Sequence, residues 1–168
     1  RVPPAFFLTA AAFRAHLDQN DLRARIAARV AQLPSDPREI PGEIEKIRQR
    51  ILRAPLPEAV REQVAAAYGR LGAAVVAVRS SANAEDLPGH SFAGQYETIL
   101  GVRSLEECLH AIQRCWASLW TPRAYEYRRR NGIDHRQVEM AVIVQQQIEP
   151  QAAGVAFTAD PVTGSRSR

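Results

Sequence analysis

The chain has 168 residues, of which 46% are hydrophobic and 24% charged, and it carries a formal net charge of +4. This length suits a single domain with a real core, and the composition is that of a soluble globular protein. No apolar run approaches the ~20 residues needed to cross a bilayer, and the N-terminal segment RVPPAFFLTAAAF lacks the pattern of a signal peptide. We therefore expect no membrane partner.

The positive charge comes almost entirely from arginine, since Lys46 is the only lysine. Most arginines alternate with Glu and Asp along predicted helices, which is typical of solvated helix faces. The one dense basic cluster, at 128–130, lacks the aromatic residues of a stacking platform, and we interpret it as a solvated helix end. We therefore expect no nucleic-acid partner. The alternative, nucleic-acid binding through these arginines, would show a steep salt dependence.

The two cysteines, Cys108 and Cys115, lie seven residues apart on a predicted helix. That spacing separates them by roughly 10 Å along the helix axis, beyond the ~7 Å between Cα atoms that a disulfide tolerates. We predict buried free thiols, which are typical of a reducing compartment and favour a cytoplasmic location. The Cys and His residues show no metal-ligand spacing.

The first seventy residues predict one short strand followed by helices. The strand covers Ala5 to Leu8, and Thr9 is placed to cap the helix that follows. Apolar residues recur at helical spacing in three further segments: after Asp21, from Gly42 to Arg53, and after Pro57. We expect these helices to act as scaffold rather than to carry chemistry.

The most informative stretch begins with a β-branched apolar run at 73–78, which predicts a buried strand. The strand ends in Arg79 and two serines, a loop with glycine and proline follows at 82–95, and an extended segment at 96–102 closes the unit. Arginine suits phosphate because its planar fork donates two parallel hydrogen bonds and keeps its charge. Backbone N–H groups around Gly94 would add an anion-binding nest.

The same pattern also fits an ordinary surface connection with a solvated arginine. The chain contains neither GxGxxG nor GxxxxGK[ST], so neither a Rossmann nor a P-loop site explains the stretch. Because glycine-containing loops are common, spacing alone leaves the phosphate site and the plain connection as open alternatives.

The remaining chain predicts two helices and two strands. A capping-box pattern starts a strongly amphipathic helix at Ser104, and Thr121-Pro122 starts a second one that ends at Asn131-Gly132. Strands are predicted at 138–144 and 154–158. The fold class is therefore α+β, with helices packed on a mixed or mostly antiparallel sheet.

Four segments resemble the ATP-binding domain of the phosphoenolpyruvate synthase and pyruvate phosphate dikinase family. The signature-like segment is VAVRSSANAEDLPGHSFAGQYETILGV, followed by the helix pair CWASLWTPRAYEYRRRNGIDH and the strand pair VEMAVIVQQQIEPQAAGVAFTADPVTG. The opening segment RVPPAFFLTAAAF is similar to the VPPGF-type start of that domain. The helix and strand pairs are closest to rifampicin phosphotransferase-like members.

The resemblance implies a partial ATP-grasp fold over residues 1–168, with possible sub-lobes 1–102 and 103–168. Arg79 matches the arginine that contacts the ATP phosphates, the segment 91–95 matches the phosphate-side loop, and Gln145 falls where the family meets adenine. The nucleotide-binding positions that the resemblance implies are Arg79, Ser91, Gly94, Gln95, Thr98 and Gln145.

The resemblance also implies functional groups of the family that we expect to lie outside these 168 residues. The family's Gly-Gly-Lys-Gly segment, with its phosphate-contacting lysine, should precede Val2, and its magnesium carboxylate should follow the last residue. The histidine that carries phosphate belongs to a separate domain, and none of the four histidines here matches it: His16, His90, His110 and His135. We therefore expect no catalytic residue and no metal ligand within the chain.

The implied function is the ATP-binding portion of a dikinase-type phosphotransferase. Such an enzyme splits ATP, phosphorylates a histidine in a separate domain and passes the phosphate to a small acceptor such as pyruvate or a rifamycin. The expected cofactors are ATP and Mg²⁺, the expected partners are the phosphohistidine and acceptor-binding domains of the parent protein, and the isolated chain is expected to be inactive. The alternative is a non-catalytic, truncated ATP-grasp module that docks onto a partner, which exposed apolar surface would favour.

Overall fold

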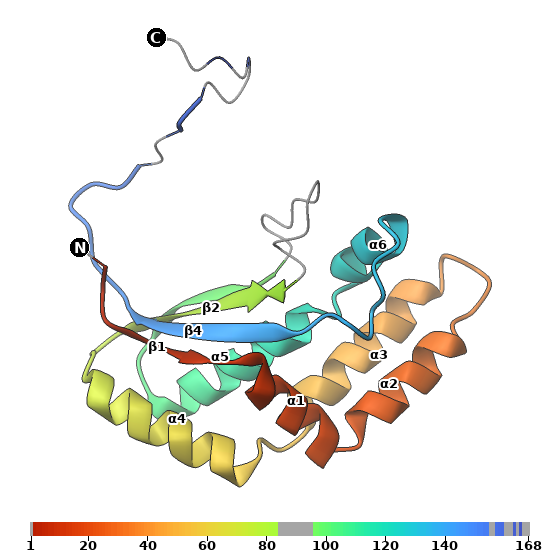
Figure 1. The fold of residues 1–168 in the computed structure, drawn as a ribbon, viewed down its shortest axis with the longest axis horizontal. Helices are drawn as coiled ribbons and strands as arrows, with labels where there is room; N and C mark the ends of the chain where they lie inside the picture. The colour runs from red at the N-terminus through yellow and green to blue at the C-terminus, as the bar shows by residue number, and fades with distance from the viewer. Residues whose placement is uncertain (1, 84–95, 155–156, 160–162, 164, 166–168) are drawn as a thin grey trace.

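The computed structural model describes residues 2–83, 96–154, 157–159, 163 and 165. Within them, four antiparallel strands form one sheet, in the order β1-β4-β2-β3 (Figure 1). The strands are β1 (Ala5–Leu8), β2 (Val76–Ala82), β3 (Thr98–Val102) and β4 (Met140–Gln146). β4, the last of these strands in the sequence, therefore lies between β1 and β2 in the sheet.

Helices cover one face of this sheet, the lower one in Figure 1. The described helices are α1 (Ala10–Gln19), α2 (Leu22–Ala31), α3 (Ile40–Arg53), α4 (Glu58–Leu71), α5 (Leu105–Ser118) and α6 (Pro122–Arg130). α1, α4 and α5 contact strands, while α2, α3 and α6 extend the helical layer beyond the sheet. This arrangement confirms the predicted α+β class. No helix in the described part of the chain is both long and apolar enough to span a bilayer.

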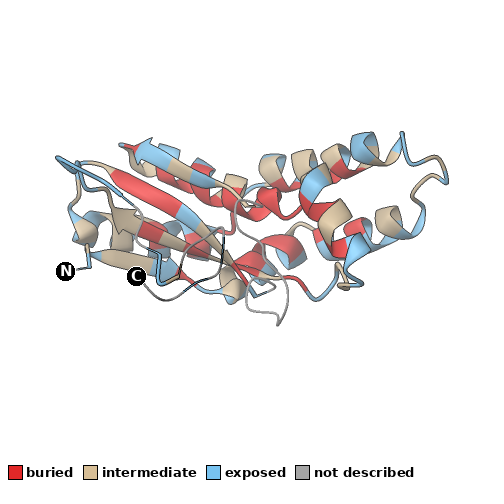
Figure 2. Ribbon diagram, turned by 90° about the horizontal axis from the view of Figure 1, so that it is seen from above, coloured by how far each residue is buried: buried red, intermediate tan, exposed pale blue. Residues whose placement is uncertain are grey.

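The two faces of the sheet differ because successive residues of a strand point to opposite sides. Val76 and Val78 of β2 and Val142 and Val144 of β4 are fully buried against the helices. Figure 2 shows buried residues along the strands and the inward helix faces, and exposed residues on the outer helix turns, on the loops and on parts of the strands. The opposite face of the sheet is not covered by any described helix (Figure 1).

α5 is the central helix of the core, as its apolar stripe predicts. Ser104 caps it by accepting a hydrogen bond from the Glu107 N–H at 3.1 Å, and the Glu107 carboxylate accepts one from the Arg103 N–H at 2.8 Å. Its cysteines, Cys108 and Cys115, are free and buried, and burial raises the pKa of both thiols to about 12. The predicted free thiols are confirmed.

Strand boundaries and one predicted strand differ from expectation. The strand expected at 73–78 is displaced to Val76–Ala82, since its polar end pairs with β4 as far as Ala82. The prediction of a strand at 154–158 is wrong at the described positions, because Gly154, Phe157 and Thr158 are not in a strand. Residues 155 and 156 lie outside the described residues. A division into sub-lobes at residue 102 stays a prediction, although both parts of the chain contribute strands to this sheet.

The basic cluster at 128–130 is only partly the solvated helix end that the sequence predicts. Arg129 and Arg130 are exposed and pair with Glu126, but Arg128 is only 1% exposed. Its Nε donates to His135 Nδ1 at 3.0 Å, and its guanidinium lies 5.3 Å from the Trp120 ring centroid. Helical spacing explains the difference, because position 128 is on the buried face that begins at Ala124 and Tyr125.

Candidate functional site

Three of the six predicted nucleotide-binding residues meet on the uncovered face of the sheet. Arg79 of β2 lies opposite Ile143 of β4 on one side and opposite Thr98 of β3 on the other. Gln145 lies two residues along β4 from Ile143, so it is a diagonal neighbour of Arg79. Such pairs have Cβ atoms roughly 5 Å apart when directly opposite and lie roughly 7–8 Å apart on the diagonal. The sheet therefore brings Arg79, Thr98 and Gln145 within the span of one small ligand.

Arg79 is the only charged residue in the four described strands. Its side chain is exposed, and within the described part of the chain it forms no ion pair. A guanidinium that no described carboxylate neutralises is available for an anion, and Arg is suited to phosphate because it donates two parallel hydrogen bonds. The chemistry that this position offers is therefore recognition of a phosphate-like group.

Thr98 and Gln145 add neutral polar groups on either side of this charge. Thr98 is exposed at the start of β3, where its hydroxyl can donate and accept hydrogen bonds. Gln145 is partly buried, and its Nε2 donates to the Pro3 carbonyl at 3.3 Å. This bond orients the amide and leaves its oxygen as an acceptor for a ligand donor.

Apolar side chains that sequence reasoning missed flank these polar groups. Phe7 of β1 lies opposite Ile143 and is 68% exposed, and Leu100 of β3 is 65% exposed. Ligand sites are commonly lined by apolar groups with a few polar ones between them. The alternation of side chains along β1 could have predicted this, because Phe6 packs against the core and its neighbour Phe7 must then point to the opposite face.

The other three predicted residues, Ser91, Gly94 and Gln95, lie outside the described residues. Their role in a phosphate-side loop stays a prediction. Within the described residues, no group of three or more His, Cys, Asp or Glu side chains is arranged to hold a metal ion.

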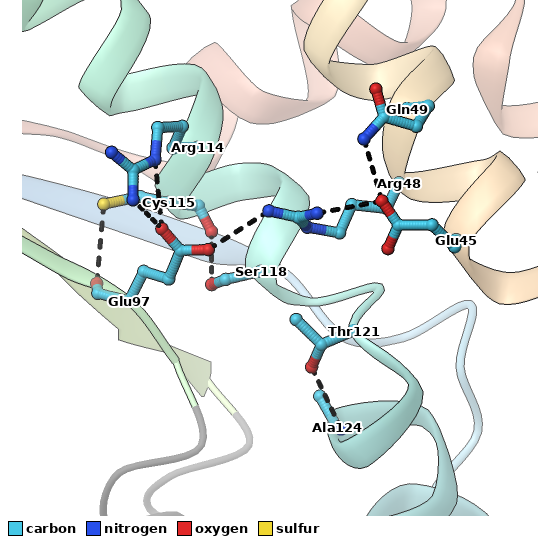
Figure 3. Close-up of polar contacts among 9 residues, drawn as sticks. All are labelled: Glu45, Arg48, Gln49, Glu97, Arg114, Cys115, Ser118, Thr121 and Ala124. Atoms are coloured by element: carbon cyan, nitrogen blue, oxygen red, sulfur yellow. Dashed lines mark hydrogen bonds and ion pairs between the residues drawn. The ribbon is translucent and has the colours of Figure 1, made fainter. Parts of the chain in front are cut away.

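On the helix side of the sheet, Glu97 joins the residues before β3 to two helices. This residue was not identified from the sequence. Its carboxylate accepts hydrogen bonds from Arg114 on α5, and it pairs with Arg48 on α3 (Figure 3). The signal for it was weak, because a single acidic residue beside a strand does not reveal partners that lie 17 and 49 residues away.

A cavity of about 400 Å³ lies elsewhere, between α1, α2 and the segment 134–139, and contains none of the six predicted residues. Its walls are mainly apolar, with Phe13 and Trp120 among them. The arginines that line it are paired with carboxylates: Arg14 with Glu139, Arg23 with Asp18 and Arg136 with Asp134. Because these cations are already neutralised, the cavity is poorly suited to phosphate, and the face around Arg79 is the better candidate.

Comparison with known proteins shows the family of the chain. Residues 1–168 match the family model described as pyruvate phosphate dikinase, AMP/ATP-binding domain. The chain belongs to this family. The AMP/ATP-binding domain described here is thus the kind of domain that the resemblance predicts.

Named relatives of this AMP/ATP-binding domain are larger proteins. It is 45% identical over 168 residues to a rifampicin phosphotransferase of Streptomyces sp., and 42% identical to one of Bacillus subtilis; each match covers 99% of this chain and 19% of the relative. A phosphoenolpyruvate synthase of Aeropyrum pernix is 40% identical over 175 residues, covering 99% of this chain and 21% of the relative. The chain therefore spans about a fifth of the length of these curated relatives.

Proposed function

We propose that the domain binds ATP on the uncovered face of its sheet, with the guanidinium of Arg79 on the phosphates. The observation that carries this proposal is the single charge among the four described strands: Arg79 has no ion-pair partner among the described residues, and it lies on the sheet face that no described helix covers. Membership of an AMP/ATP-binding family supports a nucleotide as the ligand.

Thr98 and Gln145 give the nucleotide an orientation in this proposal. Thr98 pairs directly with Arg79 and assists on the phosphate side, while Gln145 offers its amide oxygen to the exocyclic amine of adenine. Ser91, Gly94 and Gln95 would supply the phosphate-side loop. A second lobe over the same face would complete an ATP-grasp site and cover Phe7 and Leu100.

The whole-protein reaction that we propose is ATP-dependent phosphorylation of a histidine in a separate domain, followed by transfer to a small acceptor such as pyruvate or a rifamycin. The relatives carry the names phosphoenolpyruvate synthase and rifampicin phosphotransferase, which supports this class of reaction. Phosphoryl transfer depends on positioning and on neutralising the developing charge, and Arg79 would contribute one cation to that task. Bound Mg²⁺ would neutralise further phosphate charge, held by residues other than those described.

Arg79→Ala tests the proposed site. In the native-length protein, we expect it to weaken ATP binding by about 10- to 100-fold, because a charge-assisted bidentate contact contributes about 1.5–3 kcal/mol. Isothermal titration with ATP measures the change. Arg103→Ala is the matched control, since Arg103 is an exposed arginine just beyond β3, and it should stay within about twofold. Unchanged ATP affinity in Arg79→Ala would contradict the proposed site.

We further propose that the 168 residues alone do not turn over ATP. One arginine can help to bind phosphates, but transfer also needs a metal-held phosphate and an acceptor in line. Incubation of the chain with ATP and Mg²⁺, followed by chromatography of the nucleotides, should show no sustained release of ADP or AMP. Sustained release that scales with protein concentration would refute this proposal.

A second candidate is a non-catalytic module that docks onto a partner through the same face. The exposure of Phe7 and Leu100 favours it, because large apolar side chains on a sheet face commonly mark an interface. The titration above separates the two, since a docking module binds no ATP whether or not Arg79 is present.

A further inference from the structure

Glu97 connects the uncovered face to the helical layer through contacts on both its side chain and its backbone. Its Oε2 accepts hydrogen bonds from Arg114 Nε at 3.1 Å and Nη2 at 2.7 Å, and its Oε1 lies 3.4 Å from Arg48 Nη2. Its backbone carbonyl accepts from the Ser80 N–H at 3.4 Å and from the Cys115 thiol at 3.6 Å. Figure 3 shows Glu97 held between Arg114 and Arg48, with Cys115 beside it.

These contacts bear directly on the candidate site because Glu97 immediately precedes Thr98. Neighbouring residues on an extended chain point to opposite sides, so Glu97 faces the helices while Thr98 faces the ligand side next to Arg79. The Ser80 N–H that bonds to Glu97 likewise follows Arg79 in the chain. The peptide groups that follow Arg79 and precede Thr98 are therefore hydrogen-bonded to each other, and the one that precedes Thr98 is also bonded to Cys115 on α5.

We infer that Glu97 is a positioning residue: clamped by Arg114 and Arg48, it sets the place of Thr98 relative to Arg79. This inference rests on the proposed nucleotide site. Arg114 is the stronger half of the clamp, because it donates two charge-assisted hydrogen bonds, whereas the Arg48 contact is longer. The Glu97 side chain is only 26% exposed, so water screens these contacts less than it screens a fully exposed surface pair.

The physical consequence concerns the start of β3. Without the clamp, backbone pairing with β2 still holds Arg79 opposite Thr98, and the Cys115 thiol still bonds to the Glu97 carbonyl, but Glu97 loses its side-chain ion pairs with α3 and α5. The two phosphate contacts then have to be brought into register when the nucleotide binds, which costs affinity for the phosphate tail. Contacts to the nucleoside, proposed at Gln145 on β4, are not affected.

Glu97→Gln in the native-length protein tests the clamp, with ATP and adenosine titrated in parallel. We expect about 5- to 20-fold weaker ATP binding, which lies within the range of coupling between contacting residues, and less than about twofold change for adenosine. Glu45→Gln is the matched control, because Glu45 also accepts from Arg48, at 2.9 Å, yet its contacts stay within α3. It should leave both affinities unchanged.

Arg114→Met provides a second variant that keeps Glu97 and removes its main donor, and it should reproduce the selective loss for ATP. Equal losses for ATP and adenosine would indicate a general structural role and overturn the inference, as would unchanged ATP affinity in a folded Glu97→Gln protein. If Arg79→Ala also leaves ATP affinity unchanged, the proposed nucleotide site itself fails. Loss in Arg79→Ala but not in Glu97→Gln rejects only the clamp.

Discussion

Trp116→Ala is expected to lower the free energy of unfolding by about 3–5 kcal/mol. Trp116 is fully buried on α5, and its ring lies 5.8 Å from that of Phe13 and 5.2 Å from that of His16, both on α1. Removing it opens a cavity where two helices and the sheet meet, and the surrounding side chains close it only partly. Urea unfolding followed by circular dichroism measures the change.

Trp116→Phe is the matched variant for this site. The indole Nε1 is buried and has no hydrogen-bond partner in the described part of the chain, so its loss relieves an unsatisfied donor while most of the ring volume is kept. We expect a loss below about 1.5 kcal/mol. A Trp116→Ala protein as stable as this phenylalanine variant would show that the site repacks freely, against the expectation.

Acidification from pH 7.5 to 5.0 is expected to lower the free energy of unfolding, by at most about 3 kcal/mol, because burial opposes protonation of two histidines in the fold. His16 is fully buried, and burial lowers its pKa below the usual 6.5. Burial, assisted by the charge of Arg128, lowers the pKa of His135 to about 4. Below pH 6.5 the unfolded chain therefore takes up protons that the folded chain does not, so stability falls as pH falls.

A histidine that stays neutral in the fold can lower the free energy of unfolding by at most about 2 kcal/mol between pH 6.5 and 5.0, and the partial exposure of His135 reduces its share to about half of that. The carboxyls of Glu126 and Asp134 do not interfere. Adjacent arginines lower the pKa of both to about 2, so they affect stability only below about pH 4.5.

Urea unfolding at pH 7.5, 6.5 and 5.0 tests this prediction. His16→Gln keeps a donor for the Ile51 carbonyl, and His135→Asn keeps an acceptor for Arg128. The double variant should lose most of the pH dependence in this window, whereas His110→Gln, at an exposed position, should retain it. A double variant that loses as much stability on acidification as the unmodified protein would place the acid sensitivity elsewhere.

Local signals predicted the helices well. The cap at Ser104, the apolar stripe of α5 and the turn at Gly132, whose φ is +66°, all depend on residues within a few positions of one another. Strand ends were less predictable, because pairing with β4 extends β2 through two serines that no local pattern assigns to a strand. The strand order is set by contacts between distant segments and leaves no local mark in the sequence.

The residues of the candidate site were likewise only partly predictable from the sequence. Arg79 was identifiable from its chemistry at the end of an apolar run, and the resemblance pointed to Thr98 and Gln145. Glu97 and Phe7 were missed because their roles depend on which elements become neighbours: two arginines from separate helices for Glu97, and the uncovered sheet face for Phe7. Their importance follows from the tertiary arrangement.

The position of β4 between β1 and β2 also affects how the protein is made. During synthesis, the N-terminal strand leaves the ribosome on the order of ten seconds before its only described strand partner, at about 5–20 residues per second. Until then, the apolar Phe6 and Leu8 have no sheet to join, and only the β2–β3 hairpin can pair. The nascent chain therefore passes through a stage in which chaperone binding to the β1 segment would protect it from aggregation.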